Sequence, residues 1–366
     1  MSMVTRVDNA VAVFNELIGR LGQHAVASGG EEYMQPYVYL SLHTVQMLTE
    51  GWQVDFDELA AVSGASALFG YKPDDSMPRY AHLMVDAAGA MQEGLDLEPD
   101  QLIHGIDQRI ATATGFGYAW TSFEGAEGAW KLIVETVDAG HTAKGWDWEG
   151  ILFAGYNNAA DTRDRWIFAM ADGPETYTKW LSWEEFCEWV DRVIGWQQAQ
   201  LGRFAGRVEP APAKDVALQV LRDLITWSTQ PPNAVHARFP GATWGLAGIR
   251  KYGEESRKAD IHETWVACHD INPQWTIRNS TAVYLDRTVK AEIFTGRVNT
   301  HLEAAAEQYH AAYSCWAAFY DLLGHSVPDA VQKMPARRHA GSAIVTAWLA
   351  HEEAGLAEVK AALAAV

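Results

Sequence analysis

Four residues suited to ligand binding or proton transfer stand directly before a short apolar run: Trp146, Asp147, Trp148 and Glu149. Carboxylates can give or take protons, and indoles stack on flat ligands. The run that follows, Gly150–Tyr156, has the continuous apolar pattern of a strand buried on both faces. Asn157 then begins a polar turn. The pattern predicts polar and aromatic side chains at the ends of a core strand.

A second strand is predicted over Trp166–Met170, and Asp172 follows it in a turn. Two buried strands that carry carboxylates at their ends, beside aromatic side chains, favour a binding or catalytic site. The same pattern also fits two ordinary core strands with acidic turns. The residues themselves leave both interpretations open.

The other elements of the first half are predicted from apolar spacing, which indicates helices over residues 4–25, 35–51 and 127–138. Ser182 and Glu185 have the spacing of a capping box, in which each side chain bonds the backbone of the other residue. A helix is therefore expected to begin after Ser182 and to continue to about residue 201.

The length of 366 residues is sufficient for two domains. The chain has 28 Lys and Arg against 47 Asp and Glu, a net charge of −19, which disfavours nucleic acid and anionic membranes as partners. No apolar run has the length of a membrane span, and the N-terminus lacks the pattern of a signal peptide. Three distant cysteines, Cys187, Cys268 and Cys315, predict reduced, buried thiols in a cytoplasmic protein.

A linker is predicted at Arg207–Ala213, where two prolines stand among small residues. Residues 1–205 are expected to form one domain and residues 214–366 a second, almost entirely helical one. Seven residues of the second domain recur at intervals of three and four, as one stripe on a helix: Leu302, Ala306, Tyr309, Tyr313, Trp316, Tyr320 and Leu323. The stripe favours core packing, with a ligand wall as the alternative.

Common catalytic motifs are absent from the sequence, which has no Walker loop, no Cys-x-x-Cys and no Gly-x-Ser-x-Gly. Gly115-Phe-Gly117 is only a fragment of a dinucleotide-binding loop. Glu307 and His310 have the spacing of half a di-iron site, but the chain contains no second Glu-x-x-His. Neither a metal nor an organic cofactor is therefore expected.

Several short motifs occur in a recognisable order: Tyr39-Leu-Ser at a helix start, Ser63-Gly-Ala, Gly155-Tyr-Asn, a strand ending at Asp172, Trp183-Glu-Glu-Phe, and the helical segments Arg278–Leu285 and Leu302–Tyr309. This order resembles the papain-like fold of bacterial bacteriocin-peptidase-like proteins, in the branch similar to the N-terminal domain of butirosin-type acyltransferases. The resemblance implies an α+β fold. It implies a papain-like domain with an antiparallel or mixed sheet, followed by an all-helical C-terminal domain.

In that family a cysteine at a helix start is the nucleophile, and a histidine and an acid approach it from two strands. The resemblance assigns the nucleophile position to Tyr39, the histidine position to Glu149 and the acid position to Asp172. No cysteine precedes Cys187. A glutamate cannot activate a tyrosine, whose ordinary pKa is about 10, as a histidine activates a cysteine. Thiol-protease and thiol-acyltransferase chemistry are therefore not expected.

Three functions remain open. The first is a catalytically inactive relative that binds a small molecule in a cytoplasmic pathway of bacterial specialised metabolism. The second is an acyltransferase or amide hydrolase without cysteine, in which Tyr39 is the proton donor, Glu149 the general base and Asp172 the third catalytic residue. The third is a structural partner subunit, and a homodimer is a further expectation. Four residues are expected to contact a ligand: Gln35, Trp146, Trp148 and Asn157.

Overall fold

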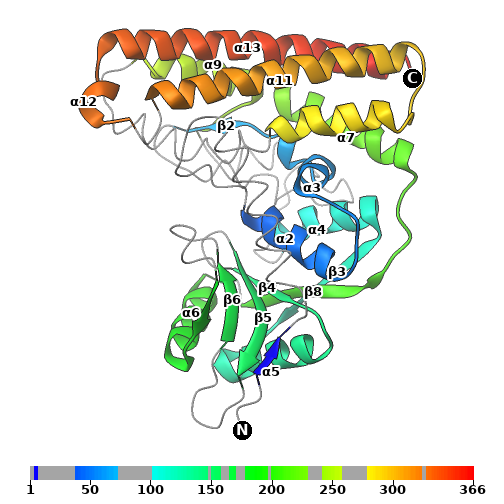
Figure 1. Cartoon of the computed structure of the whole chain (residues 1–366), viewed down its shortest axis with the longest axis vertical. Helices are drawn as coiled ribbons and strands as arrows, with labels where there is room; N and C mark the ends of the chain where they lie inside the picture. Colours follow the sequence, from blue (N-terminus) through cyan, green and yellow to red (C-terminus); the bar gives the residue numbers. More distant parts are fainter. Residues whose placement is uncertain are drawn as a thin grey trace. The chain divides into compact units, whose positions relative to one another are not determined.

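The computed structural model describes residues 4–6, 38–72, 101–146, 150–157, 165–169, 178–196, 199–229, 241–257, 278–323 and 327–366. These residues belong to two compact units (Figure 1). The sheet unit comprises the described parts of residues 1–21, 37–56 and 114–209, and the helical unit those of residues 22–36, 57–113 and 210–366. The structure is α+β, as expected. Compact grouping does not test independent folding, so the domains 1–205 and 214–366 stay a prediction.

The sheet unit is built on antiparallel strands in the order β3-β8-β4-β5-β6-β7, and β1 pairs with β5. Their bounds are β1 Val4–Arg6, β3 Phe116–Ser122, β4 Ala143–Gly145, β5 Ile151–Asn157, β6 Arg165–Ala169, β7 Thr178–Leu181 and β8 Gln200–Arg207. The prediction of two adjacent antiparallel strands after Gly150 is confirmed by β5 and β6. Every residue from Ile151 to Tyr156 is buried, as the apolar run predicted.

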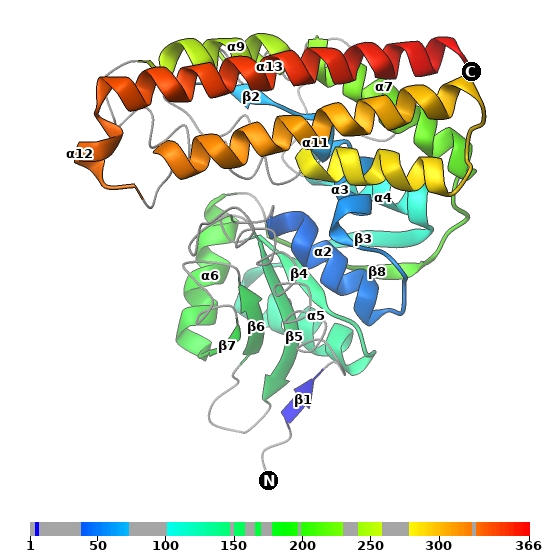
Figure 2. The ribbon, with the colours of Figure 1, turned by 45° about the horizontal axis from the view of Figure 1, so that its top comes forward.

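Helices pack on both faces of this sheet. Phe153 of β5 contacts Phe186 and Trp189 of α6 (Trp183–Gly195), and α6 packs beside α5 (Gly125–Asp138). Gly150, just before β5, faces Leu42 of α2 (Val38–Thr49) instead. Figure 1 and Figure 2 both show α2 next to β4 and β8.

Two helix predictions fail at their ends. Val4–Arg6, inside the helix predicted over residues 4–25, is a strand, because its backbone pairs with the end of β5 that β4 does not reach. The capping box of Ser182 and Glu185 is confirmed, but the helix ends at Gly195 rather than near residue 201. Strand β8 follows, because Gly202 allows the backbone to approach the ring of Tyr118, where a Cβ would lie 2.3 Å from the hydroxyl.

The helical unit consists mainly of helices: α3 Phe56–Val62, α4 Gln101–Thr114, α7 Ala213–Thr229, α9 Gly245–Glu255, an unlabelled helix over residues 278–290, α11 Arg297–Leu323, α12 Asp329–Gln332 and α13 Pro335–Ala364. The short turn η1 (Ala65–Ala67) and the two-residue strands β2 (Gly70–Tyr71) and β9 (Thr243–Trp244) complete it. The prediction of an almost entirely helical segment after residue 214 is confirmed for the described residues.

Helices α11 and α13 lie side by side and antiparallel (Figure 2). His301 at the start of α11 bonds Glu358 near the end of α13, and Tyr309 lies against Gly355. The predicted stripe of α11 is buried, except that Tyr313 is only half-buried. Its C-terminal part, from Trp316 to Leu323, joins a core with Tyr252 of α9 and Trp348 of α13. Cys315, predicted to be buried, is only half-buried at the edge of this core. Core packing, rather than a ligand wall, therefore explains these stripe residues.

A buried ion pair crosses the helical unit. Arg278 donates through Nε to Glu352 Oε1 at 2.8 Å and through Nη2 to Oε2, so the pair is bidentate. The Nη1 group donates to the backbone oxygen of Ser66 at 2.8 Å, and the Nε1 group of Trp348 donates to Glu352 Oε1 at 3.1 Å. Two charges removed from water in this way need such complete pairing.

We expect Glu352→Gln to lower the free energy of unfolding by about 3–5 kcal/mol, because it leaves the guanidinium of Arg278 buried without a counter-charge. The neighbouring Glu353 supplies a control, because its pair with Arg250 has side-chain exposures of 48% and 56%. Glu353→Gln is expected to cost less than about 1 kcal/mol. Urea denaturation of both variants measures the difference, and equal losses would contradict the role of the buried pair.

Candidate functional site

Four residues with polar groups recur at intervals of four, three and four: Tyr39, His43 and Gln46 of α2, and Glu50 directly after its end. This spacing places them in a row along one side of a helix. Each contacts a residue in or beside strand β4: Tyr39 contacts Trp146, His43 contacts Lys144, Gln46 contacts Thr142 and Glu50 contacts His141. Successive residues of α2 contact successively earlier residues in or before β4, so the helix runs antiparallel to the strand. We call these eight residues the polar interface of the sheet unit.

Lys144 lies at the centre of this interface with 0% of its surface exposed. Alternation along β4 explains its direction. Gly145 faces Trp189 of α6, so the side chain of Lys144 points to the opposite face, where α2 packs. Its Nζ lies 2.9 Å from His43 Nδ1 and 3.5 Å from the centre of the Tyr39 ring. The amine therefore contacts both an imidazole nitrogen and the π face of an aromatic ring.

Flat aromatic rings surround the amine. Tyr39 stacks on Trp146 with ring centres 5.3 Å apart, and Trp146 lies nearly parallel to Trp120, at 13° and 6.5 Å. Lys144 Nζ is 4.9 Å from the centre of the Tyr118 ring and 5.7 Å from that of Trp120. The Nε1 group of Trp146 is buried and makes no hydrogen bond within the described part of the chain. The amine of Lys144 is thus enclosed by aromatic rings that pack on one another.

Neutral hydrogen bonds occupy the middle of the interface. Gln46 Nε2 donates to the backbone oxygen of Thr142 at 3.0 Å, and the hydroxyl of Tyr118 donates to Gln46 Oε1 at 3.0 Å. Gln46 is 1% exposed. These bonds connect α2 to both β3 and the residue before β4, and so fix the position of the helix along the sheet.

A glutamate–histidine pair forms the other end of the interface. Glu50 Oε1 lies 2.7 Å from His141 Nδ1, and the His141 side chain is 32% exposed. Burial raises the pKa of Glu50, and its hydrogen bond and charge interaction with His141 oppose that rise. Such a carboxylate can orient an imidazole for proton transfer.

The structure brings together two of the residues predicted for the site. Tyr39 lies in the first turn of α2 and stacks on Trp146. Asn157 lies at the other end of β5 from Ile151, about 20 Å away along a strand of this length, where it pairs with Val4. The remaining predicted residues lie outside the described residues: Gln35, Trp148, Glu149 and Asp172. The catalytic and ligand-binding roles stay predictions.

Sequence reasoning missed the residues at the centre of the polar interface. The sequence pattern places Leu40, Thr44, Met47 and Leu48 on one helix face; the first three are buried and Leu48 is half-buried. The structure shows that His43 and Gln46, on another side of the same helix, are buried as well. Their spacing from Tyr39 was a usable signal, because four polar-capable residues in one row can meet one partner strand.

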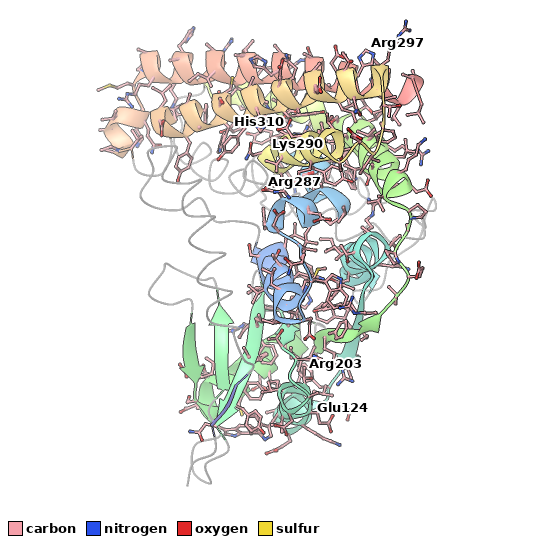
Figure 3. All side chains as sticks on the ribbon, turned by 45° about the vertical axis from the view of Figure 1, so that its right-hand side comes forward. Glu124, Arg203, Arg287, Lys290, Arg297 and His310 are labelled. Carbon is pink, nitrogen blue, oxygen red and sulfur yellow. The ribbon has the colours of Figure 1, made fainter. Side chains whose placement is uncertain are left out.

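His310, considered earlier for a metal site, has hydrogen-bonding partners instead. Its Nε2 lies 3.0 Å from Asp286 Oδ2, and its Nδ1 lies 3.3 Å from Asn279 Oδ1. Figure 3 shows His310 on α11 and, on the unlabelled helix, Arg287 and Lys290. Among the residues that the structure describes, no group of three or more His, Cys, Asp and Glu is arranged to hold a metal ion.

Comparison with protein-family models gives no match for this chain, and comparison with curated proteins gives none either. No helix within the described ranges has the length and apolar character needed to span a membrane. The geometry of the polar interface is therefore the basis on which a function is proposed.

We expect Glu50→Gln to change the pH dependence of stability. A carboxyl whose pKa is higher in the folded than in the unfolded protein stabilises the fold at low pH. It loses that contribution as the pH rises from its ordinary value, here 4.5, through the folded pKa. The stability of the wild type relative to Glu50→Gln should therefore fall between pH 4 and pH 7, as measured by urea denaturation.

Glu135→Gln is the control for this experiment, because Glu135 lies in the same unit and its side chain is 50% exposed. Its stability relative to the wild type should change little over the same pH range. If the stability of the wild type relative to Glu50→Gln instead rises with pH, burial does not control this carboxyl.

Proposed function

We propose that this protein binds a small organic molecule beside Lys144, on a papain-like scaffold. The observation that carries the proposal is the burial of the Lys144 amine against His43 Nδ1 and the ring of Tyr39. The cytoplasmic location and the role in bacterial specialised metabolism are parts of the proposal that rest on the sequence.

The burial of Lys144 is the first argument for a functional role. Removing an ammonium group from water costs several kcal/mol. A contact with an aromatic face recovers about 2 kcal/mol when the cation is desolvated. Ionisable groups in such surroundings are concentrated at binding and catalytic sites. A buried amine beside an imidazole is therefore a candidate for a functional group.

The chemistry around Lys144 indicates the class of ligand. An amine and an imidazole together can donate hydrogen bonds to a carboxylate or carbonyl oxygen. Tyr39 stacks on Trp146 and Trp146 on Trp120, so a planar ligand ring would bind beside the amine by replacing one of these stacking partners. An aromatic carboxylic acid or aromatic aldehyde combines both features.

A second candidate, favoured by the 2.9 Å contact between Lys144 Nζ and His43 Nδ1, is an enzyme that uses the amine. The imidazole can accept a proton from the amine, which then attacks a carbonyl carbon, and loss of water gives an imine. Tyr39 is the proton donor to the departing oxygen in this scheme. It differs from the non-cysteine acyl transfer that the resemblance suggests, because the lysine forms the covalent bond.

Two probes test these candidates: benzoate, which can only bind, and benzaldehyde, which can also form an imine. Benzoate should raise the melting temperature of the full-length wild type, by mass action on the folded state. Lys144→Met should weaken benzoate binding about tenfold or more, because one charge-assisted hydrogen bond is lost. Lys144→Arg, which keeps the charge, should retain part of the affinity.

Benzaldehyde followed by borohydride reduction should modify Lys144 saturably, as shown by mass spectrometry of peptides, if the amine enzyme is correct. Lys131 is the control, because its side chain is 76% exposed and should react without saturation. Binding of benzoate without modification of Lys144 would favour the binding protein over the enzyme. Absence of both, with circular dichroism showing intact folds, would exclude Lys144 as the site and leave the structural partner subunit.

A further inference from the structure

The helical unit contains a cavity of about 360 Å³ between α4 and α7. A volume of this size falls in the range of small-ligand pockets. Residues of both signs and of apolar character line it, among them Arg109, Val216, Leu218, Gln219 and Arg222. This cavity is separate from the Lys144 site, which belongs to the sheet unit.

Arg109 forms the inner side of the cavity, with 13% of its side chain exposed. Its Nη1 is paired with Asp223 Oδ2, and Gln219 Nε2 donates to the other oxygen, Oδ1, at 2.9 Å. Burial raises the pKa of Asp223, and the charges of Arg109 and Arg222 act against that rise. Within the described ranges, Arg109 Nε is buried without a hydrogen-bond partner. A guanidinium group is thus held at the cavity with its hydrogen-bonding capacity only partly used.

Helix α7 presents a second cation to the same cavity. Asp215, Leu218, Gln219 and Arg222 recur at intervals of three, one and three along one face of α7, and all line the cavity. Asp215 and Arg222 lie about 10 Å apart along the axis, because an α-helix rises 1.5 Å per residue. The positive end of the cavity is therefore at Arg222 and Arg109, and Leu218 and Val216, on two sides of α7, add apolar surface to its lining.

We propose that this cavity binds a small carboxylate with an apolar tail. The carboxylate would pair with Arg222 at the positive end, with Arg109 as the second cation. The tail would pack on Val216 and Leu218, where it removes apolar surface from water. An inorganic anion would pair with the arginines but would not cover the apolar residues. A carboxylate with an apolar tail therefore fits the lining better than free phosphate.

The binding test uses three probes on the full-length protein: hexanoate, its uncharged analogue hexanamide, and inorganic phosphate. Isothermal titration calorimetry should give one saturable site for hexanoate, weaker binding of phosphate, and no measurable binding of hexanamide. Arg222→Gln should weaken hexanoate binding about tenfold, because one charge-assisted contact is lost. Arg222 is the residue of choice, because it is exposed, whereas loss of Arg109 would leave Asp223 buried and unpaired.

Asp215→Asn is the matched control, because it removes one charge of opposite sign from the same face of α7. It should leave hexanoate affinity unchanged or raise it, and Lys144→Met should leave it unchanged. The proposal fails if Arg222→Gln has no effect, if Asp215→Asn weakens binding as Arg222→Gln does, or if phosphate binds as tightly as hexanoate. An adventitious weak association would show equal affinity for hexanamide and would also overturn it.

Discussion

The buried pair of Arg278 and Glu352 is the interaction on which the helical unit depends. It joins residues 74 positions apart, and the guanidinium also bonds Ser66 of η1 and lies 5.3 Å from the ring centre of Tyr309. Burial alone would lower the pKa of Arg278, but the charge of Glu352 raises it overall, so the cation is permanent. Because neither charge can return to water, the helix over residues 278–290, α11, α13 and η1 must keep one arrangement.

The sheet unit is held by a different constraint, the alignment of α2 with strand β4. The interactions along this line change from aromatic at Tyr39 to neutral hydrogen bonds at Gln46 and to a carboxylate–imidazole pair at Glu50. A shift of α2 by one turn would place each of these groups against the wrong partner. Apolar packing alone tolerates such shifts more easily, so the polar contacts select one register. Lys144 lies in the middle of the line and is therefore positioned by contacts on both sides.

Local signals in the sequence predicted the local elements well. The apolar run before Tyr156 gave a buried strand, and Ser182 with Glu185 gave a capped helix, because both patterns are complete within a few residues. Strand β8 was missed because its two glycines, Gly202 and Gly206, interrupt any periodic pattern, and Gly202 is explained by a contact with Tyr118, 84 positions away. The candidate site failed to emerge for the same reason. A lone lysine between alanine and glycine gives no sign that a distant helix buries it.

The buried cations Arg278 and Lys144 differ in their partners, and this difference separates a structural role from a chemical one. The guanidinium of Arg278 meets both carboxylate oxygens of Glu352 and a backbone oxygen, so its directional donors are matched by fixed acceptors. Such a group can hold elements together but has no protonation state to exchange near neutral pH. The contacts of Lys144 include an imidazole, which can accept or donate a proton, and the face of the Tyr39 ring. An amine can also lose its proton and form a covalent bond, which a guanidinium cannot do readily. The physical chemistry of their partners therefore assigns stability to Arg278 and makes Lys144 the residue at which to look for function.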